Sequence, residues 1–130
     1  MKSSQLNNEN PPASASSPRD NPCLDRDSTI AALEAISDGG ISYLLPYAQF
    51  MYAEKIPNPA LEKEPDAPPE KVLIHFACAD VVILGSGLKR LTQEIQKYEL
   101  KFVKSADRRL AATLKTHIAA LTVTLTKENI

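Results

Sequence analysis

The chain has 130 residues, a formal net charge of −1 and a hydrophobic content of 43%. This size and composition are typical of one globular domain with a single core, and they exclude a collagen-like chain and a chain that is disordered throughout. Aromatic residues make up only 5% of the sequence and tryptophan is absent, so we expect a mainly aliphatic core.

The charge is distributed unevenly between the two halves of the sequence. Residues 1–70 carry 5 basic and 11 acidic residues, whereas residues 71–130 carry 10 basic and 5 acidic ones. A basic folded region preceded by acidic segments either binds a polyanion or is screened by those segments.

The two cysteines, Cys23 and Cys78, are too few for a disulfide framework, although a bridge between them is left open. Unpaired thiols are usual in reducing compartments. The sequence contains neither a secretory signal pattern nor an apolar run long enough to span a membrane, so we expect a cytoplasmic protein.

The N-terminal third is predicted to hold a tail and a short helix. Residues 1–26 are rich in Ser, Asn, Pro and Asp and have little to bury, which predicts a disordered tail. Asp27 or Ser28 offers an N-cap, and the apolar spacing over residues 30–36 predicts a short helix that ends at residues 38–40.

The middle of the chain is predicted to hold a strand and a long loop. Aromatic residues alternate with small or polar ones over residues 47–54, which favours a strand, with a helix as the competing interpretation. Residues 56–70 are rich in proline and glutamate and predict a connecting loop.

The pattern beyond residue 70 is stronger. Apolar runs over residues 72–77 and 81–84 predict a hairpin, or else one long bent strand. Residues 88–98 form an amphipathic helical pattern, in which Leu88, Leu91, Ile95 and Tyr98 occupy one face and Glu94 belongs to the polar face.

Three further elements are predicted at the end of the chain. Residues 99–104 suit a strand, Asp107 suits the cap of a helix over residues 108–117, and the alternation of Leu or Val with Thr over residues 118–126 suits a final strand. Residues 127–130 are a predicted C-terminal tail. We therefore expect an α+β fold over residues 27–126, with a mostly antiparallel sheet of four or five strands and one or two helices on one face.

The segment Gly85, Ser86 and Gly87 lies between a predicted strand and a predicted helix. Backbone N–H groups at such a corner are able to bind phosphate. However, neither the third glycine of a dinucleotide fingerprint nor the Lys-Ser/Thr of a P-loop follows. We favour a structural corner in which Ser86 or Gly87 caps the helix.

No arrangement of residues predicts catalysis, a cofactor or a metal. His75 and Cys78 are a single short pair, whereas a tetrahedral zinc site needs four ligands. No nucleophile motif is present, and the acidic residues of the apolar half form no evident pair. We expect the protein not to be an enzyme.

The sequence thus leaves two hypotheses about function. We favour a non-catalytic module that associates with itself, as a homodimer, or with another protein, because small domains with a free sheet edge often pair. The alternative is nucleic-acid or phosphate-ligand binding by the basic half, for which the candidate residues are Lys89, Arg90, Lys97, Lys101, Arg108, Arg109, Gly85, Ser86 and Gly87.

Overall fold

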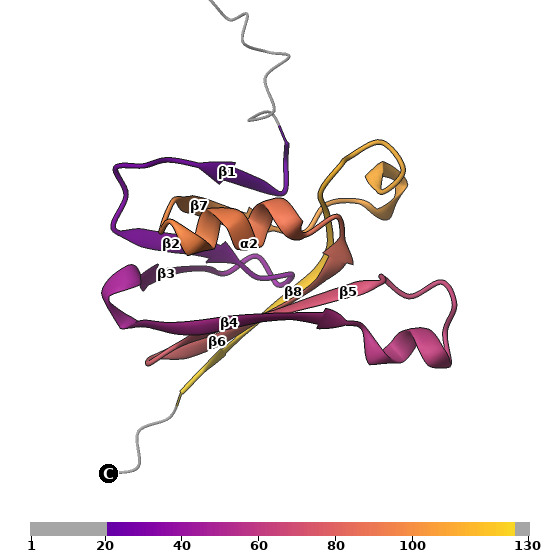
Figure 1. Cartoon of the computed structure of the whole chain (residues 1–130), viewed down its shortest axis with the longest axis horizontal. Coiled ribbons are helices and arrows are strands. Elements are labelled where there is room, and N and C mark those ends of the chain that lie inside the picture. The colour runs from indigo at the N-terminus through magenta and orange to yellow at the C-terminus, as the bar shows by residue number, and fades with distance from the viewer. Residues whose placement is uncertain (1–20, 127–130) are drawn as a thin grey trace, which may run out of the picture.

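The computed structural model describes residues 21–126, which form two four-stranded sheets and one α-helix (Figure 1). The first sheet has the strand order β1-β7-β2-β3. Its strands pair antiparallel except for β2 and β7, which are parallel. Their bounds are β1 (Leu24–Arg26), β7 (Leu100–Lys104), β2 (Ala32–Ile36) and β3 (Ser42–Pro46).

The second sheet has the strand order β4-β5-β6-β8 and is antiparallel throughout. Its strands are β4 (Phe50–Pro57), β5 (Glu70–Phe76), β6 (Ala79–Ser86) and β8 (His117–Leu125). The helix α2 (Lys89–Gln96) follows β6, and the 3₁₀ turns are η3 (Tyr47–Gln49), η4 (Pro59–Glu62) and η5 (Arg108–Leu110). Across residues 21–126, no helix is both long enough and apolar enough to cross a membrane.

The fold combines a helix with β-sheets, as expected, but it has more strands than the sequence predicted. The prediction of one sheet of four or five strands is wrong, because the strands divide into two sheets of four. The additional strands are β1, β2 and β3, which come from the part of the sequence with the weakest patterns.

The helix predicted over residues 30–36 is also wrong. Residues Ala32–Ile36 form β2, which lies between β7 and β3, and Leu33 and Ala35 are its buried positions. The expected cap residue Asp27 instead accepts hydrogen bonds from the N–H and hydroxyl of Thr29, at 2.8 and 2.6 Å, and so forms a local turn.

Part of the predicted N-terminal tail belongs to the fold. Residues Leu24–Arg26 form β1, which pairs with β7. Cys23 and Leu24 are fully buried. Their burial holds this short polar segment against the rest of the fold. The remainder of the predicted tails, residues 1–20 and 127–130, lies outside the described residues.

The stronger patterns of the sequence are confirmed. The strand alternative for residues 47–54 is correct from Phe50 onward, and residues 70–86 form the hairpin of β5 and β6 rather than one bent strand. The predicted amphipathic helix is α2, and the strands expected after it are β7 and β8.

The helix predicted over residues 108–117 does not form. Asp107 accepts a hydrogen bond from the N–H of Arg109 at 2.9 Å, as a cap would, but only the three residues of η5 are helical. The segment 108–113 is exposed. Because a short helix depends on burying one face, this segment has nothing to hold a longer helix together.

The apolar interior is one continuous cluster. It receives Leu33 and Val103 from the first sheet, Ile74 and Ile83 from the second, and Leu91 from α2, all fully buried. The helix contacts β7 and runs across the first sheet in Figure 1. The two sheets and the helix therefore share a single core.

The two cysteines are both free, and they differ in their surroundings. Burial raises the pKa of the Cys23 thiol, against the lowering effects of the Ile118 N–H and Lys104. Cys78 lies in the partly exposed turn between β5 and β6. Thiolates react faster than thiols, so we expect an aromatic disulfide reagent to modify Cys78 in the folded protein and Cys23 only after unfolding. Equal rates in a stopped-flow assay of the two single-cysteine variants would contradict this placement.

Candidate interaction surface

The Gly-Ser-Gly corner between β6 and α2 is packed tightly against the segment that leads into β8. A Cβ atom on Gly85 would overlap the carbonyl oxygen of His117, and one on Gly87 would overlap that of Lys115. Gly87 also has a positive φ of 62°, which glycine adopts without strain. The close approach of the backbone at Lys115 and His117 therefore explains why both positions are glycine, and no ligand is needed to explain them.

The N-terminus of α2 already has an anionic partner. The N–H of Leu88, the N-cap residue, donates to Oε1 of Glu70 at 2.8 Å, and no side chain at the cap itself accepts a hydrogen bond. The prediction that Ser86 or Gly87 caps the helix is therefore wrong. A carboxylate from the start of β5 lies where a bound phosphate would be expected.

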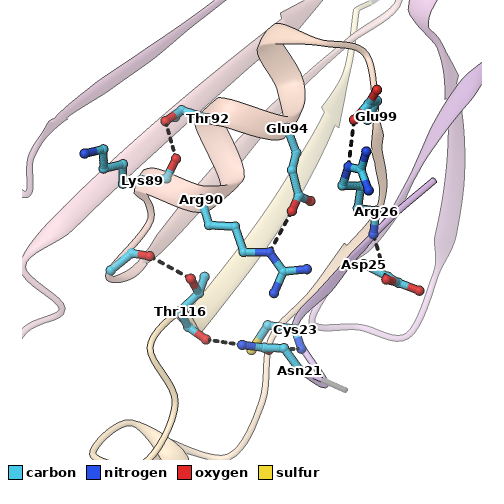
Figure 2. A network of polar contacts seen from close by, with 11 residues as sticks. Asn21, Cys23, Asp25, Arg26, Lys89, Arg90, Thr92, Glu94, Glu99 and Thr116 are labelled. Atoms are coloured by element: carbon cyan, nitrogen blue, oxygen red, sulfur yellow. Dashed lines mark hydrogen bonds and ion pairs between the residues drawn. The ribbon is translucent and has the colours of Figure 1, made fainter. Parts of the chain in front are cut away.

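Arg90, one of the candidate phosphate contacts, is engaged within the protein. Its Nε lies 2.6 Å from Oε2 of Glu94, one turn further along α2 (Figure 2). Glu94 was expected on the polar face, but its side chain is only 9% exposed. Its other oxygen, Oε1, has no hydrogen-bond partner among the described residues. The guanidinium of Arg90 therefore compensates a buried charge.

Removing Arg90 is expected to destabilise the protein. Breaking a fully buried ion pair typically costs about 3–5 kcal/mol. Because Arg90 is partly exposed, we expect about 1–3 kcal/mol for Arg90→Ala in a denaturant titration, by analogy with unsatisfied buried groups. The double variant Arg90→Ala/Glu94→Gln should recover part of this loss, because it no longer buries an unpaired carboxylate. A double variant no more stable than the single one would contradict this role for Glu94.

The basic candidate residues do not share one helical face, because the second helix is absent. Lys89, Lys97 and Lys101 are exposed on α2, just beyond it and on β7. Arg109 forms an exposed ion pair with Asp107 at 3.2 Å, and hydrogen bonds from Arg109 lower the pKa of Asp107. The positive charges are thus distributed over separate elements.

Three of the candidate residues, Gly85, Ser86 and Arg108, do line one groove. It has a volume of about 780 Å³ and lies where the loop after β4 and the loop containing η5 meet the end of the second sheet, at the right of Figure 1. The loop carboxylates Glu64 and Asp66 line the same groove. Acidic side chains in the groove oppose the binding of an anion there.

His75 and Cys78 do not form part of a metal cluster. His75 lies directly opposite Asp80 in the β5–β6 pair, and its Nδ1 is 2.9 Å from Oδ1 of Asp80. Its ring stacks on Tyr52 with centroids 4.3 Å apart. Within residues 21–126, no three His, Cys, Asp or Glu side chains are grouped so that they could hold a metal ion.

One edge of the second sheet is covered by segments that flank the strands of the first sheet. At the β8 edge, the N–H of Ile118 donates to Sγ of Cys23 at 3.3 Å, and its carbonyl accepts from the N–H of Ala106 at 3.0 Å. Leu121 exchanges two hydrogen bonds with Asp38, both of 3.1 Å. The polar groups of β8 are therefore satisfied at two points by segments of the same chain.

The opposite edge of this sheet, β4, is open. Its inner side pairs with β5 over the whole strand, from Phe50 to Pro57. Between Met51 and Pro57, no backbone hydrogen bond to any other described segment is formed. The outward N–H and C=O groups of this eight-residue strand are thus available to another extended chain.

A groove of about 540 Å³ runs beside this open edge, between β4 and the C-terminal part of α2. Its lining includes Phe50, Met51, Tyr52, Ile95 and Tyr98. Of these lining residues, Met51, Tyr52 and Tyr98 are 62%, 49% and 48% exposed, so the groove is bordered by large side chains that reach the surface. Such grouping on one side of a small protein marks a candidate interaction site.

Tyr98 is held in an unusual backbone conformation beside this groove. It has a φ of 57°, and it ends α2 in a Schellman motif, in which Glu99 N–H donates to the carbonyl of Glu94 and Tyr98 N–H to that of Ile95. Glycine is usual at this position, because the left-handed conformation costs other residues about 1–2 kcal/mol of conformational energy. The tyrosine ring stacks on Tyr47, with centroids 5.0 Å apart, and meets the edge of Phe50 at 5.6 Å.

No protein-family model, curated protein or solved structure matches this chain. The residues of the open edge and its groove are therefore assigned a role from their geometry alone.

The open edge and its groove were not identified from the sequence, although a compositional signal for them exists. The chain has only seven aromatic residues, and three of them, Tyr47, Phe50 and Tyr52, fall within six positions. With Phe76 and Tyr98, Tyr47 and Phe50 form one connected set of ring contacts. In a chain so poor in aromatic residues, this density over residues 47–52 marks the place where the start of β4 packs against Tyr98 at the end of α2.

Proposed function

We propose that this domain is a non-catalytic protein-interaction module that binds an extended segment of polypeptide along β4. The observation that carries the proposal is the open edge of β4 beside a groove with exposed Met51, Tyr52 and Tyr98. Strand addition of this kind uses main-chain hydrogen bonds for affinity and neighbouring pockets for alternate side chains. The open edge of β4 can supply the main-chain hydrogen bonds, and the groove beside it can receive the side chains.

The conformation of Tyr98 gives independent support. A bulky residue with a positive φ carries backbone strain, and it is tolerated only where contacts with the surrounding structure compensate that strain. Residues strained in this way cluster at functional sites. Glycine at position 98 would relieve about 1–2 kcal/mol of backbone strain. It would also lose two ring contacts worth about 0.5–1.5 kcal/mol each. The backbone strain thus offsets part of what these ring contacts contribute, while Tyr98 supplies nearly half-exposed aromatic surface to the groove.

The β3 edge of the first sheet is a weaker candidate. It is also unpaired on its outer side and exposes Leu44. However, it has only five residues, ends in Pro46, and contributes no residue to either groove. Leu44 therefore serves as a matched control position for the β4 edge.

A selection from a displayed library of random ten-residue peptides would test the proposal. The immobilised wild-type domain is expected to enrich peptides with alternating apolar residues. Met51→Lys and Tyr98→Gly are each expected to weaken binding of the enriched peptides at least tenfold, which corresponds to about 1.4 kcal/mol. Leu44→Lys should leave binding unchanged, and circular dichroism should show that the Tyr98→Gly domain is folded under the conditions of the binding measurement.

Two results would contradict the proposal. The first is a selection that enriches no peptide above background for the wild-type domain. The second is a set of peptides that bind the Met51→Lys and wild-type domains equally, because those peptides would use another surface.

Phosphate or nucleic-acid binding by the basic half has less support from the geometry. Glu70 occupies the N-terminus of α2, Glu94 engages Arg90, and Glu64 and Asp66 share the groove of Arg108. A salt titration with a generic RNA and a generic duplex DNA tests this alternative. Binding whose logarithmic affinity falls by about 0.7–0.9 per phosphate as the logarithm of salt rises, and that Lys89→Glu/Arg108→Glu abolishes, would favour it.

We also propose a cytoplasmic location. The two unpaired thiols support it, because free cysteines are usual in a reducing compartment. Fluorescence microscopy of the full chain, tagged at its C-terminus, tests the location directly, and signal confined to a secretory compartment would contradict it.

A further inference from the structure

We propose that the segment bound along β4 is β4 of a second copy of this chain, paired antiparallel about a two-fold axis at Ala53. This inference rests on the proposed function, because it names the partner of the same open edge. It follows from the order of charges along the strand and from the geometry of two-fold strand pairing.

A two-fold axis between two identical antiparallel strands places one residue opposite its own copy. Residues directly opposite each other have side chains on the same face of the sheet, about 4.5–5.5 Å apart at Cβ. Like charges opposite each other are destabilising. The residue at the axis therefore decides whether the pairing is favourable.

The charges of β4 exclude two of the central positions. An axis at Glu54 would place two carboxylates opposite each other, and an axis at Lys55 would place two ammonium groups opposite each other. Tyr52 is also unsuitable, because the β4–β5 register shifts between Phe50 and Tyr52 and the strand is irregular there. Ala53 is the central position free of both problems.

An axis at Ala53 also gives complementary neighbours. Tyr52 comes to lie opposite Glu54 of the second copy, where the phenol hydroxyl can donate to the carboxylate. Lys55 comes to lie near the irregular segment around Met51 of the second copy, where its aliphatic stem can cover the thioether. Each contact occurs twice by symmetry. The strand is thus complementary to itself in this register, with one basic and one acidic side chain per copy.

The grooves support the same arrangement. Ala53 is opposite Ile74 in the β4–β5 pair, and Ile74 is fully buried, so Ala53 belongs to the face of the sheet that carries the core. Ala53 also lines the groove between β4 and α2. Around an axis at Ala53, the grooves of the two copies lie next to each other. Association would then cover exposed apolar surface on both copies at once.

Site-specific cross-linking of the full chain tests the register. In a Cys78→Ser background, in which Cys23 is fully buried, single cysteines are introduced as Ala53→Cys, Lys55→Cys and Leu44→Cys. Each is treated with a short bifunctional methanethiosulfonate reagent at several protein concentrations. We expect Ala53→Cys to give covalent dimer at least ten times faster than Lys55→Cys and Leu44→Cys. Sedimentation equilibrium of the untreated wild type should give twice the chain mass at high concentration, and Met51→Lys should weaken this association at least tenfold.

The outcomes separate this inference from the proposed function. A wild type that stays monomeric at high concentration, while selected peptides still bind the β4 edge, would overturn the self-pairing and leave the edge with another partner. A dimer that cross-links fastest through Leu44→Cys would overturn it in favour of the β3 edge. Fastest cross-linking through Lys55→Cys would overturn the register at Ala53. If the chain is monomeric and no peptide binds, both the partner and the proposed function are overturned.

Discussion

Replacing Leu91 by alanine is expected to lower the free energy of unfolding by about 2–4 kcal/mol. Leu91 is fully buried in the cluster shared by α2 and both sheets, and truncation of a buried leucine removes apolar contacts and leaves a cavity. A domain of this size has about 5–15 kcal/mol of stability in total. The loss would therefore be visible in a single urea titration as a large shift of the midpoint.

Lys89→Ala is the matched control for this variant, because Lys89 is exposed on the same helix. It should change the free energy of unfolding by less than about 0.5 kcal/mol, as is usual for surface substitutions. If the two variants lose equal stability, the face that α2 presents to the core has been assigned incorrectly.

Gly85→Ala is expected to have a comparable or larger effect, of about 3 kcal/mol or more. The added Cβ would overlap the carbonyl oxygen of His117 in the neighbouring strand β8. Overpacking typically costs about 1–3 kcal/mol where side chains can adjust. In this case the obstacle is backbone, so β6 and β8 must separate. Thermal unfolding followed by circular dichroism would measure the loss.

Gly39→Ala provides the comparison, because its added Cβ would meet only Oγ of Ser37, at an ordinary distance of 3.8 Å. It is expected to leave the melting temperature unchanged or to raise it slightly, since alanine restricts the unfolded chain. A Gly85→Ala protein that melts with the Gly39→Ala protein would contradict the close packing of β6 against β8.

The elements predicted correctly from the sequence are those whose pattern matched their tertiary surroundings. The stripe of Leu88, Leu91 and Ile95 predicts α2, and all three residues are buried. The apolar runs around His75 predict the β5–β6 hairpin, which contributes Ile74 and Ile83 to the core. In these segments, local preference and burial agree.

The elements that were missed depend on contacts between distant segments. The apolar spacing over residues 30–36 fits a short helix, but Leu33 and Ala35 also fit alternate positions of a strand, and pairing with β3 and β7 decides between the two. β1 is too short and polar to be recognised alone, and it exists because β7 lies beside it. Tertiary pairing commonly overrides weak local propensity.

The surroundings of the candidate residues could not be predicted from the sequence for a related reason. Charge patterns locate Arg90 and Arg108 among basic residues, but they do not show that Glu94 and the loop carboxylates Glu64 and Asp66 lie beside them. Likewise, the pattern over residues 47–54 predicts a strand but not its place at the edge of a sheet. Whether a strand is central or at an edge is a property of the assembled fold.

Hydrogen exchange at β4 tests most directly whether this edge is the docking surface. In dilute protein, the amides of β4 that point away from β5 are expected to exchange rapidly, whereas those of Ile118 and Leu121 in β8 are protected by their hydrogen bonds. On saturation with a selected peptide, or at high protein concentration, exchange within Met51–Ile56 is predicted to slow at least tenfold while that of β3 stays constant. Unchanged exchange at β4 in the presence of bound peptide, with new protection at β3 or in the groove lined by Arg108, would contradict the assignment of β4 as the interaction edge.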